Sequence, residues 1–153
     1  MATTLNIDSA KTLFHVLKEG PKDTNPRNEM DVSLFRNSST RTENIRCNQE
    51  YAAQVIADLS KQNKSVWIKE DVKEEEFTTH VENTRIEVIR CEGCTFKGPH
   101  RWNEFYLIMD TSRYCVTRIS VWEKDSMLEI EFHATEMAFL GEKDTRLLLQ
   151  MKK

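Results

Sequence analysis

Chain breakers and long apolar runs are both scarce in this sequence. Its 153 residues include only four glycines and three prolines, and no repeat or low-complexity segment is visible. The longest uncharged apolar run covers residues 105–109, whereas a membrane-spanning helix needs about 20 apolar residues. The sequence therefore predicts no membrane-spanning segment, and we expect no membrane among the partners of the chain.

The chain also lacks a large excess of basic or acidic residues. The chain has 22 basic and 25 acidic residues, a net charge of -3, which gives no reason to expect a nucleic-acid surface. Its first residues lack the basic and apolar regions of a signal peptide, so we predict a cytoplasmic or nuclear protein. The length fits one domain over residues 1–153, in which we expect residues 1–7 and 150–153 to be frayed.

The cysteine pattern does not complete a metal site. The four cysteines are Cys47, Cys91, Cys94 and Cys115. Without a secretory segment, free thiols are favoured over disulfides. Cys91 and Cys94, followed by His100, have the close thiol pair of a zinc knuckle, but a structural zinc site takes four ligands and a second thiol pair is missing. The further ligand would be His80, His133, Cys47 or Cys115, none of which has a diagnostic spacing. We therefore predict no metal and no cofactor.

Catalytic signatures are absent too. The chain has no glycine-rich phosphate loop, no nucleophile elbow and no histidine pair at helical spacing. The acid–base candidates, all on predicted strands, are Tyr106, Asp110, Glu129, Glu131 and His133. We interpret them as solvated or paired sheet residues, which favours a non-enzymatic protein.

Apolar residues at helical spacing predict two helices. The first covers residues 10–19, capped by Asp8-Ser9 and ended by Gly20-Pro21. The second runs from Thr42 or Asn48 to Lys61, with Tyr51, Val55 and Leu59 on its apolar face.

Beyond residue 61 the sequence changes to strands of period two. The strands that we predict cover residues 65–69, 84–90, 103–110, 114–122 and 127–135, and residues 31–36 are a short strand or an irregular extended piece. The acidic run 70–76 is interpreted as a solvated loop or strand crossing, and residues 145–153 as a terminal strand or a frayed helix. Successive strands with such short connections form an antiparallel meander, because parallel neighbours need a long crossover. The fold class predicted is α+β: N-terminal helices packed on a curved antiparallel sheet of four to six strands.

A hairpin between the last two of these strands can be placed in register. We predict a turn at Lys124-Asp125. The opposing pairs are then Trp122 with Met127, Val121 with Leu128, Ile119 with Ile130, Thr117 with Phe132 and Cys115 with Ala134. On the other face Arg118 lies opposite Glu131, an opposite-charge pair. The helices are predicted to cover the face that holds Ile119, Val121, Leu128, Ile130 and Phe132.

The order of these elements resembles that of the nuclear transport factor 2-like superfamily of cone-shaped α+β folds. The resemblance rests on residues 9–19, 31–36, 48–61 and the strands from 84 to 135, and no diagnostic motif supports it. It implies a curved sheet around the helices, a cavity at the open end of the cone and frequent dimerisation through the outer face of the sheet. The short first helix and the acidic run 70–76 depart from the family pattern.

An apolar patch on the second sheet face leads to our functional prediction. The residues predicted to form this patch are Tyr114, Val116, Trp122 and Met127. Patches on adjacent strands mark interfaces, in which Trp and Tyr contribute much of the binding energy. We therefore predict a protein-interaction module or adaptor that binds a protein partner or a second copy of itself. The alternative is a small-molecule enzyme or ligand-binding protein that uses the cone cavity, with Asp110 or Tyr106 inside.

Overall fold

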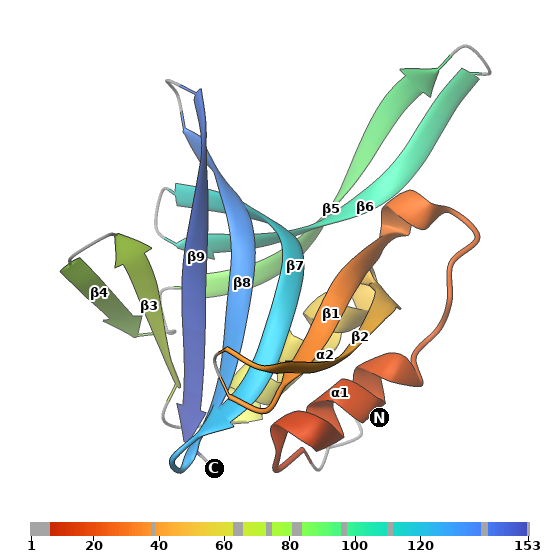
Figure 1. The fold of residues 1–153 in the computed structure, drawn as a ribbon. Helices are drawn as coiled ribbons and strands as arrows, with labels where there is room; N and C mark the ends of the chain where they lie inside the picture. Colours follow the sequence, from red (N-terminus) through yellow and green to blue (C-terminus); the bar gives the residue numbers. More distant parts are fainter. Residues whose placement is uncertain are drawn as a thin grey trace.

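A computed structural model describes the backbone of residues 7–37, 39–62, 66–72, 75–80, 84–95, 98–109, 112–138 and 141–152. Side chains are described within residues 7–37, 39–60, 103–108, 112–137 and 141–151. Figure 1 shows the arrangement: a long curved sheet, with the two helices beside its first strands. No helix in the described part of the chain is long and apolar enough to cross a membrane.

Both predicted helices are present, and local caps explain where they begin. Helix α1 (Ala10–Lys18) starts after Ser9, whose hydroxyl accepts a hydrogen bond from the Thr12 backbone N–H at 3.0 Å. Helix α2 (Gln49–Gln62) starts after Asn48, whose side chain accepts from the Tyr51 N–H at 3.0 Å. These side-chain acceptors satisfy N–H groups that have no partner within the helix. The later of the two predicted starts of the second helix is therefore correct.

The two helices meet where α1 ends. The Tyr51 hydroxyl of α2 donates to the Val16 carbonyl at 3.2 Å, and the Tyr51 ring lies directly over Gly20. A Cβ atom at position 20 would come within 2.3 Å of that ring. Only glycine therefore allows this close approach.

Nine strands within the described residues form one open sheet. They are β1 (Glu29–Phe35), β2 (Arg41–Asn48), β3 (Val66–Val72), β4 (Glu75–His80), β5 (Thr84–Thr95), β6 (Gly98–Met109), β7 (Ser112–Lys124), β8 (Met127–Ala138) and β9 (Gly141–Lys152). Their order is β2-β1-β7-β8-β9-β3-β4, and β5 and β6 branch off at β7. Figure 1 shows the β5–β6 hairpin running away from the other strands and the β3–β4 hairpin beyond β9. Every pairing is antiparallel except that of β1 with β7, which is parallel.

The fold class is confirmed as α+β, and the predicted meander is present as β5 to β9. The described residues form more than the predicted four to six strands, because β2, β4 and β9 add to the six predicted segments, β9 as one of the two alternatives for residues 145–153. Strand β2 occupies residues that one alternative gave to the second helix, and residues 70–72 and 75–76 of the acidic run belong to β3 and β4. Residues 150–152 belong to β9 and pair with β8, and Met151 is buried, so the prediction that they are frayed was wrong.

Strand β7 contains a bulge at the point where it changes partner. One edge of β7 pairs with β8, while the other pairs with β6 through residues 112–116 and with β1 through residues 118–121. Val116 lies opposite Ala134 and Arg118 opposite His133, so Thr117 is an extra residue. Its hydroxyl donates to the His133 carbonyl at 3.0 Å. A bulge of this kind reverses the alternation of side chains between the two faces.

Because of the bulge, two of our predicted interface residues lie on the other face of the sheet. Tyr114 and Val116 lie on the helix-facing side of the sheet, where they are 3% and 2% exposed. The predicted hairpin register was also wrong by two residues, because the turn is formed by Asp125 and Ser126, so Val121 lies opposite Ile130. A shift of two residues preserves the faces, whereas the single extra residue reverses them before Thr117.

One hydrophobic core joins the helices to the sheet. The core residues that we predicted on β7 and β8 are all buried in it, namely Ile119, Val121, Leu128, Ile130 and Phe132. From the helices it includes Leu13, Phe14, Leu17, Val55, Ile56 and Leu59. The periodicities of helix and strand therefore predicted the core correctly.

The central position of β8 allows a direct test of this core. Ile130 is fully buried, and Ile130→Ala is expected to lower the free energy of unfolding by about 2 to 5 kcal/mol through lost burial and a cavity. Met137, on the same strand, is 42% exposed, so Met137→Ala should change it by less than about 0.5 kcal/mol. Urea denaturation measures both. Equal effects of the two substitutions would contradict the described packing.

Candidate functional site

The outer face of the sheet, opposite the helices, carries three rows of polar and aromatic side chains across β1, β7, β8 and β9. The first, which we call the cationic row, consists of Asp31, Arg118, His133 and Arg146. The second consists of Ser33, Ser120, Glu131 and Leu148. The third consists of Trp122, Glu129 and Gln150, with Phe35 edge-on to Trp122 at a ring-centroid distance of 6.2 Å. Residues directly opposite each other in neighbouring strands are close enough to interact.

A groove of about 220 Å³ lies over these rows. It is lined by Ser33, Phe35, Arg41, Arg118, Ser120, Trp122, Glu131, His133 and Arg146. A second hollow of about 470 Å³ continues from it over β8 and β9 and shares Arg118, His133 and Arg146. The two hollows together make the outer face a long polar depression, which we call the outer groove.

The floor of the outer groove is fixed by a buried carboxylate. Glu129 is 2% exposed and Trp122 is 4% exposed. The Trp122 indole N–H donates to one oxygen of Glu129 at 2.8 Å, and the Gln150 side-chain amide donates to the other. Both oxygens are therefore paired, as a buried charge requires. Removing either donor would leave this charge undercompensated.

Glu131 and His133 form a second pair, at the wall of the groove. His133 Nε2 lies 2.6 Å from Glu131 Oε1, and the two side chains are only 17% and 23% exposed. The hydrogen bond from His133 lowers the pKa of the Glu131 carboxyl, burial opposes this, and the positive charges of His133, Arg146 and Arg118 lower the pKa further. The other ring nitrogen of His133, Nδ1, lies 3.4 Å from Arg118 Nη2.

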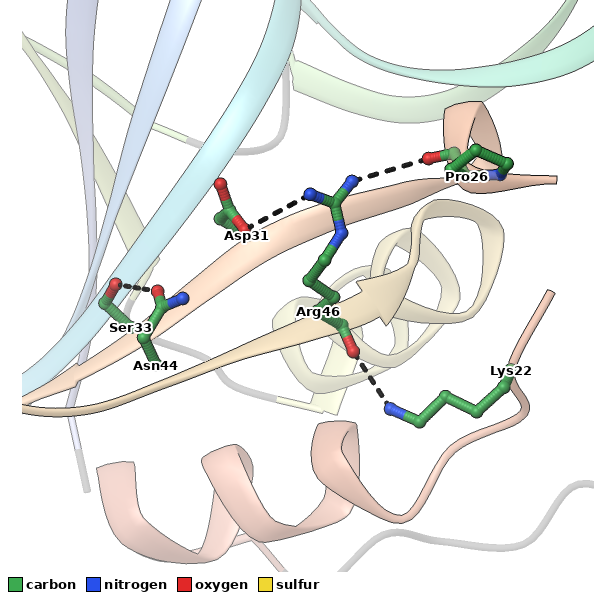
Figure 2. Close-up of polar contacts among 6 residues, drawn as sticks. All are labelled: Lys22, Pro26, Asp31, Ser33, Asn44 and Arg46. Carbon is green, nitrogen blue, oxygen red and sulfur yellow. Dashed lines mark hydrogen bonds and ion pairs between the residues drawn. The ribbon is translucent and has the colours of Figure 1, made fainter. Parts of the chain in front are cut away.

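The polar side chains of β1 are bound to β2 instead of β7. Asp31 lies 3.8 Å from the Arg46 guanidinium, and the Ser33 hydroxyl donates to the Asn44 side chain at 2.7 Å (Figure 2). No described contact joins Asp31 or Ser33 to the side chains of β7. The groups of β7 that face the groove are consequently not satisfied from the β1 side.

Arg46 also contacts the loop before β1, through both its side chain and its backbone. Its guanidinium donates to the Pro26 carbonyl at 3.4 Å, in the short helical turn η1 (Pro26–Asn28), and its own carbonyl accepts from the Lys22 ammonium at 2.9 Å (Figure 2). These contacts join the loop before β1 to strand β2.

The groove therefore presents cationic groups to solvent. Arg41, Arg118 and Arg146 are exposed, and among the described residues neither Arg41 nor Arg146 forms an ion pair within 4 Å. Glu131 is the sole carboxylate among the described side chains that line the smaller hollow. Such a set of guanidinium groups is suited to bind carboxylate or phosphate oxygens.

The arrangement offers little for acid–base chemistry or metal binding. Glu129 is fully bonded, and the lowered pKa keeps Glu131 ionised near neutral pH. Within the described residues, no three potential ligands come together to hold a metal ion. The side chains of Cys91, Cys94 and His100, and residue Asp110, lie outside the described part of the chain.

The remaining predicted residues are placed as follows. Tyr106 lies on the outer face of β6, where its hydroxyl donates to Glu104 at 2.7 Å, so it does not point into a helix-lined cavity. Trp122 is on the outer face as predicted but buried, and Met127 is half-buried. No exposed aromatic patch therefore exists among the four predicted interface residues. Arg41, Ser120 and Arg146 were not predicted as site residues, and Arg118 lies opposite His133 instead of the predicted Glu131.

Two of the predicted free thiols can be described. Cys47 forms no disulfide with a described residue, and the Cys115 thiol donates a hydrogen bond to Glu104 at 3.7 Å. Burial raises the pKa of the Cys47 thiol to about 11, so this group stays protonated and unreactive.

Comparisons with protein-family models, curated proteins and solved structures find no match. The resemblance to the nuclear transport factor 2-like superfamily therefore stays a prediction that rests on the order of elements.

The Glu131–His133 pair predicts a pH dependence of stability. The pKa of Glu131 is lower in the folded chain than its ordinary value of 4.5, so its ionised form adds stability above that value, which is lost as the pH falls through the folded pKa. Glu131→Gln should therefore reduce the loss of unfolding free energy in acid.

Urea unfolding between about pH 3 and about pH 7 measures this loss. Glu142→Gln, at an exposed position of β9, is the control and should keep the acid dependence of the unmodified chain. An unchanged acid dependence in Glu131→Gln would contradict the role of the pair.

Proposed function

We propose that this chain is a non-enzymatic protein-interaction module that binds a protein partner through the outer face of its sheet. The observation that carries the proposal is the outer groove, which exposes three arginines on a chain whose net charge is -3. An open polar depression is suited to a protein surface, because sites for small molecules are concave and mostly apolar. The described residues supply no catalytic constellation that would favour an enzyme.

The proposed binding surface differs from the apolar patch of the sequence analysis. Tyr114 and Val116 belong to the core, so they cannot contact a partner without unfolding. Trp122 contributes through the shape of the floor, since its ring lines the groove while its N–H is bonded to Glu129. The three arginines of the groove, instead of exposed aromatic residues, then bind the protein partner.

The alternative of a cone cavity has less support. The helix-facing side of β7, β8 and β9 is filled by buried side chains packed against α1 and α2 in one core. Tyr106, one of the two residues expected in that cavity, lies on the other face.

Site-specific photo-crosslinking in the cells that produce the protein tests the proposal. A photoreactive amino acid at Asp144, an exposed residue that lines the outer groove, should give a protein adduct. The same amino acid at Lys11, on the exposed side of α1, should not give that adduct. The adduct at position 144 should disappear when Arg118 and Arg146 are both replaced by Gln.

Two results would contradict the proposal. One is an adduct that survives the double substitution, since the arginines would then not bind the partner. The other is crosslinking at Lys11 with none at Asp144, which would place the interface on the helices.

A further inference from the structure

We infer that the partner segment bound in the outer groove is acidic and extended, and that its carboxylates are held by Arg118, Arg146, Arg41 and the Ser120 hydroxyl. This inference rests on the proposed function, because it names the chemistry that the same groove recognises. It is supported by an unsatisfied hydroxyl, by the spacing of the arginines and by the charge around them.

The first observation is the buried hydroxyl of Ser120. This residue is 6% exposed and lines the groove. Its side chain has no hydrogen-bond partner in the described part of the structure, while the neighbouring Ser33 is bonded to Asn44. A buried polar group without a partner lowers the stability of the folded chain. An oxygen of a ligand in the groove would accept a hydrogen bond from the Ser120 hydroxyl and remove that penalty.

The second observation is the spacing of the guanidinium groups. Arg118 on β7 and Arg146 on β9 are the two neighbours of His133 on β8, one on each side. Their backbones are therefore about 10 Å apart, twice the distance between neighbouring strands. Carboxylates of an extended chain that crosses the strands can reach both forks, and each fork can bind one carboxylate by two hydrogen bonds.

The third observation is the charge around the groove. Arg41, Arg118 and Arg146 outnumber Glu131 among the described residues that line the smaller hollow, which attracts an anion. Asp144 and the net charge of -3 repel a polyanion as dense as a nucleic acid. An extended acidic peptide carries at most one charge per about 3.3 Å, against one per about 1.7 Å in duplex DNA, so it is repelled less. An acidic protein segment is therefore the occupant that fits best.

Binding of a fluorescent hexaglutamate peptide, measured by anisotropy, tests the inference. The unmodified chain should bind it, with lower affinity at about 200 mM than at about 50 mM salt. Arg118→Gln and Ser120→Ala should each weaken binding about tenfold, the effect expected for one hydrogen bond to a charged group. Arg118→Lys should recover part of the loss, because it keeps the charge but not the planar fork.

The matched control is Arg113→Gln. Arg113 lies on the same strand and the same face as Arg118 but outside the groove, where its guanidinium stacks over the Tyr106 ring at 5.4 Å. This variant should bind the peptide like the unmodified chain. Equal losses in Arg113→Gln and Arg118→Gln would overturn the inference, since they would show only attraction by overall charge.

Other outcomes separate the sources of the anion. Binding of inorganic phosphate with none of hexaglutamate would overturn the acidic segment. A salt-sensitive dimer seen by light scattering, and lost in Arg118→Gln, would overturn the separate partner and make a second copy the occupant, through its acidic run 70–76. If hexaglutamate does not bind but the crosslink at Asp144 still depends on the arginines, the proposed function stands and only the inference on chemistry fails.

Discussion

Strand β7 pairs with β8 along one edge while its other edge passes from β6 to β1, and the extra residue Thr117 lies at that change of partner. The bulge turns Tyr114 and Val116 towards the helices, so that they share the core with Ile119 and Val121. It also places Arg118 and Ser120 on the outer face, beside the polar residues of β8 and β9. Without it, the apolar residues on the two halves of β7 would face opposite sides of the sheet.

The polar character of the outer face depends on this placement and on two further contacts. Trp122 brings an indole N–H into a buried position, and Glu129 satisfies it at the cost of burying a carboxylate. The parallel pairing of β1 with β7 brings Asp31 beside Arg118, but Arg46 of β2 holds Asp31 on the other side. Arg118 is thereby left to the groove, where it contacts a histidine instead of a carboxylate. The cationic character of the groove thus depends on strand order as much as on composition.

Much of the fold could be predicted from the sequence because periodicity is a local property. The helical spacing of Tyr51, Val55 and Leu59 and the alternation in the later strands predicted the helices, the meander and the core. The bulge was missed although the sequence has a signal for it: apolar residues fall at 114 and 116 and then at 119 and 121, a change of phase within one strand. Cys115 and Trp122 obscured this signal. Each is an apolar residue on the opposite face from its apolar neighbours, so both faces of the strand appear partly apolar.

The site was harder to predict, because each of its residues depends on a neighbour from another strand. Arg118, Ser120, Glu131 and Arg146 are ordinary polar residues of alternating strands, and only the correct registers bring them together. The parallel pairing of β1 with β7 links residues about 90 positions apart, and no local pattern predicts it. Because the predicted turn was wrong by two residues, Arg118 was paired with Glu131. The predicted pair was neutral, so the cationic row was not recognised.

The register on either side of Thr117 is the feature that tests this account most directly. Nuclear Overhauser contacts between the backbones of β7 and β8 report which residues lie opposite each other. The account predicts contacts of Ile119 with Phe132 and of Val116 with Ala134, one residue out of phase with each other. A contact of Val116 with Thr135, together with that of Ile119 with Phe132, would mean an unbroken register. It would place Val116 on the outer face and contradict the arrangement of both faces.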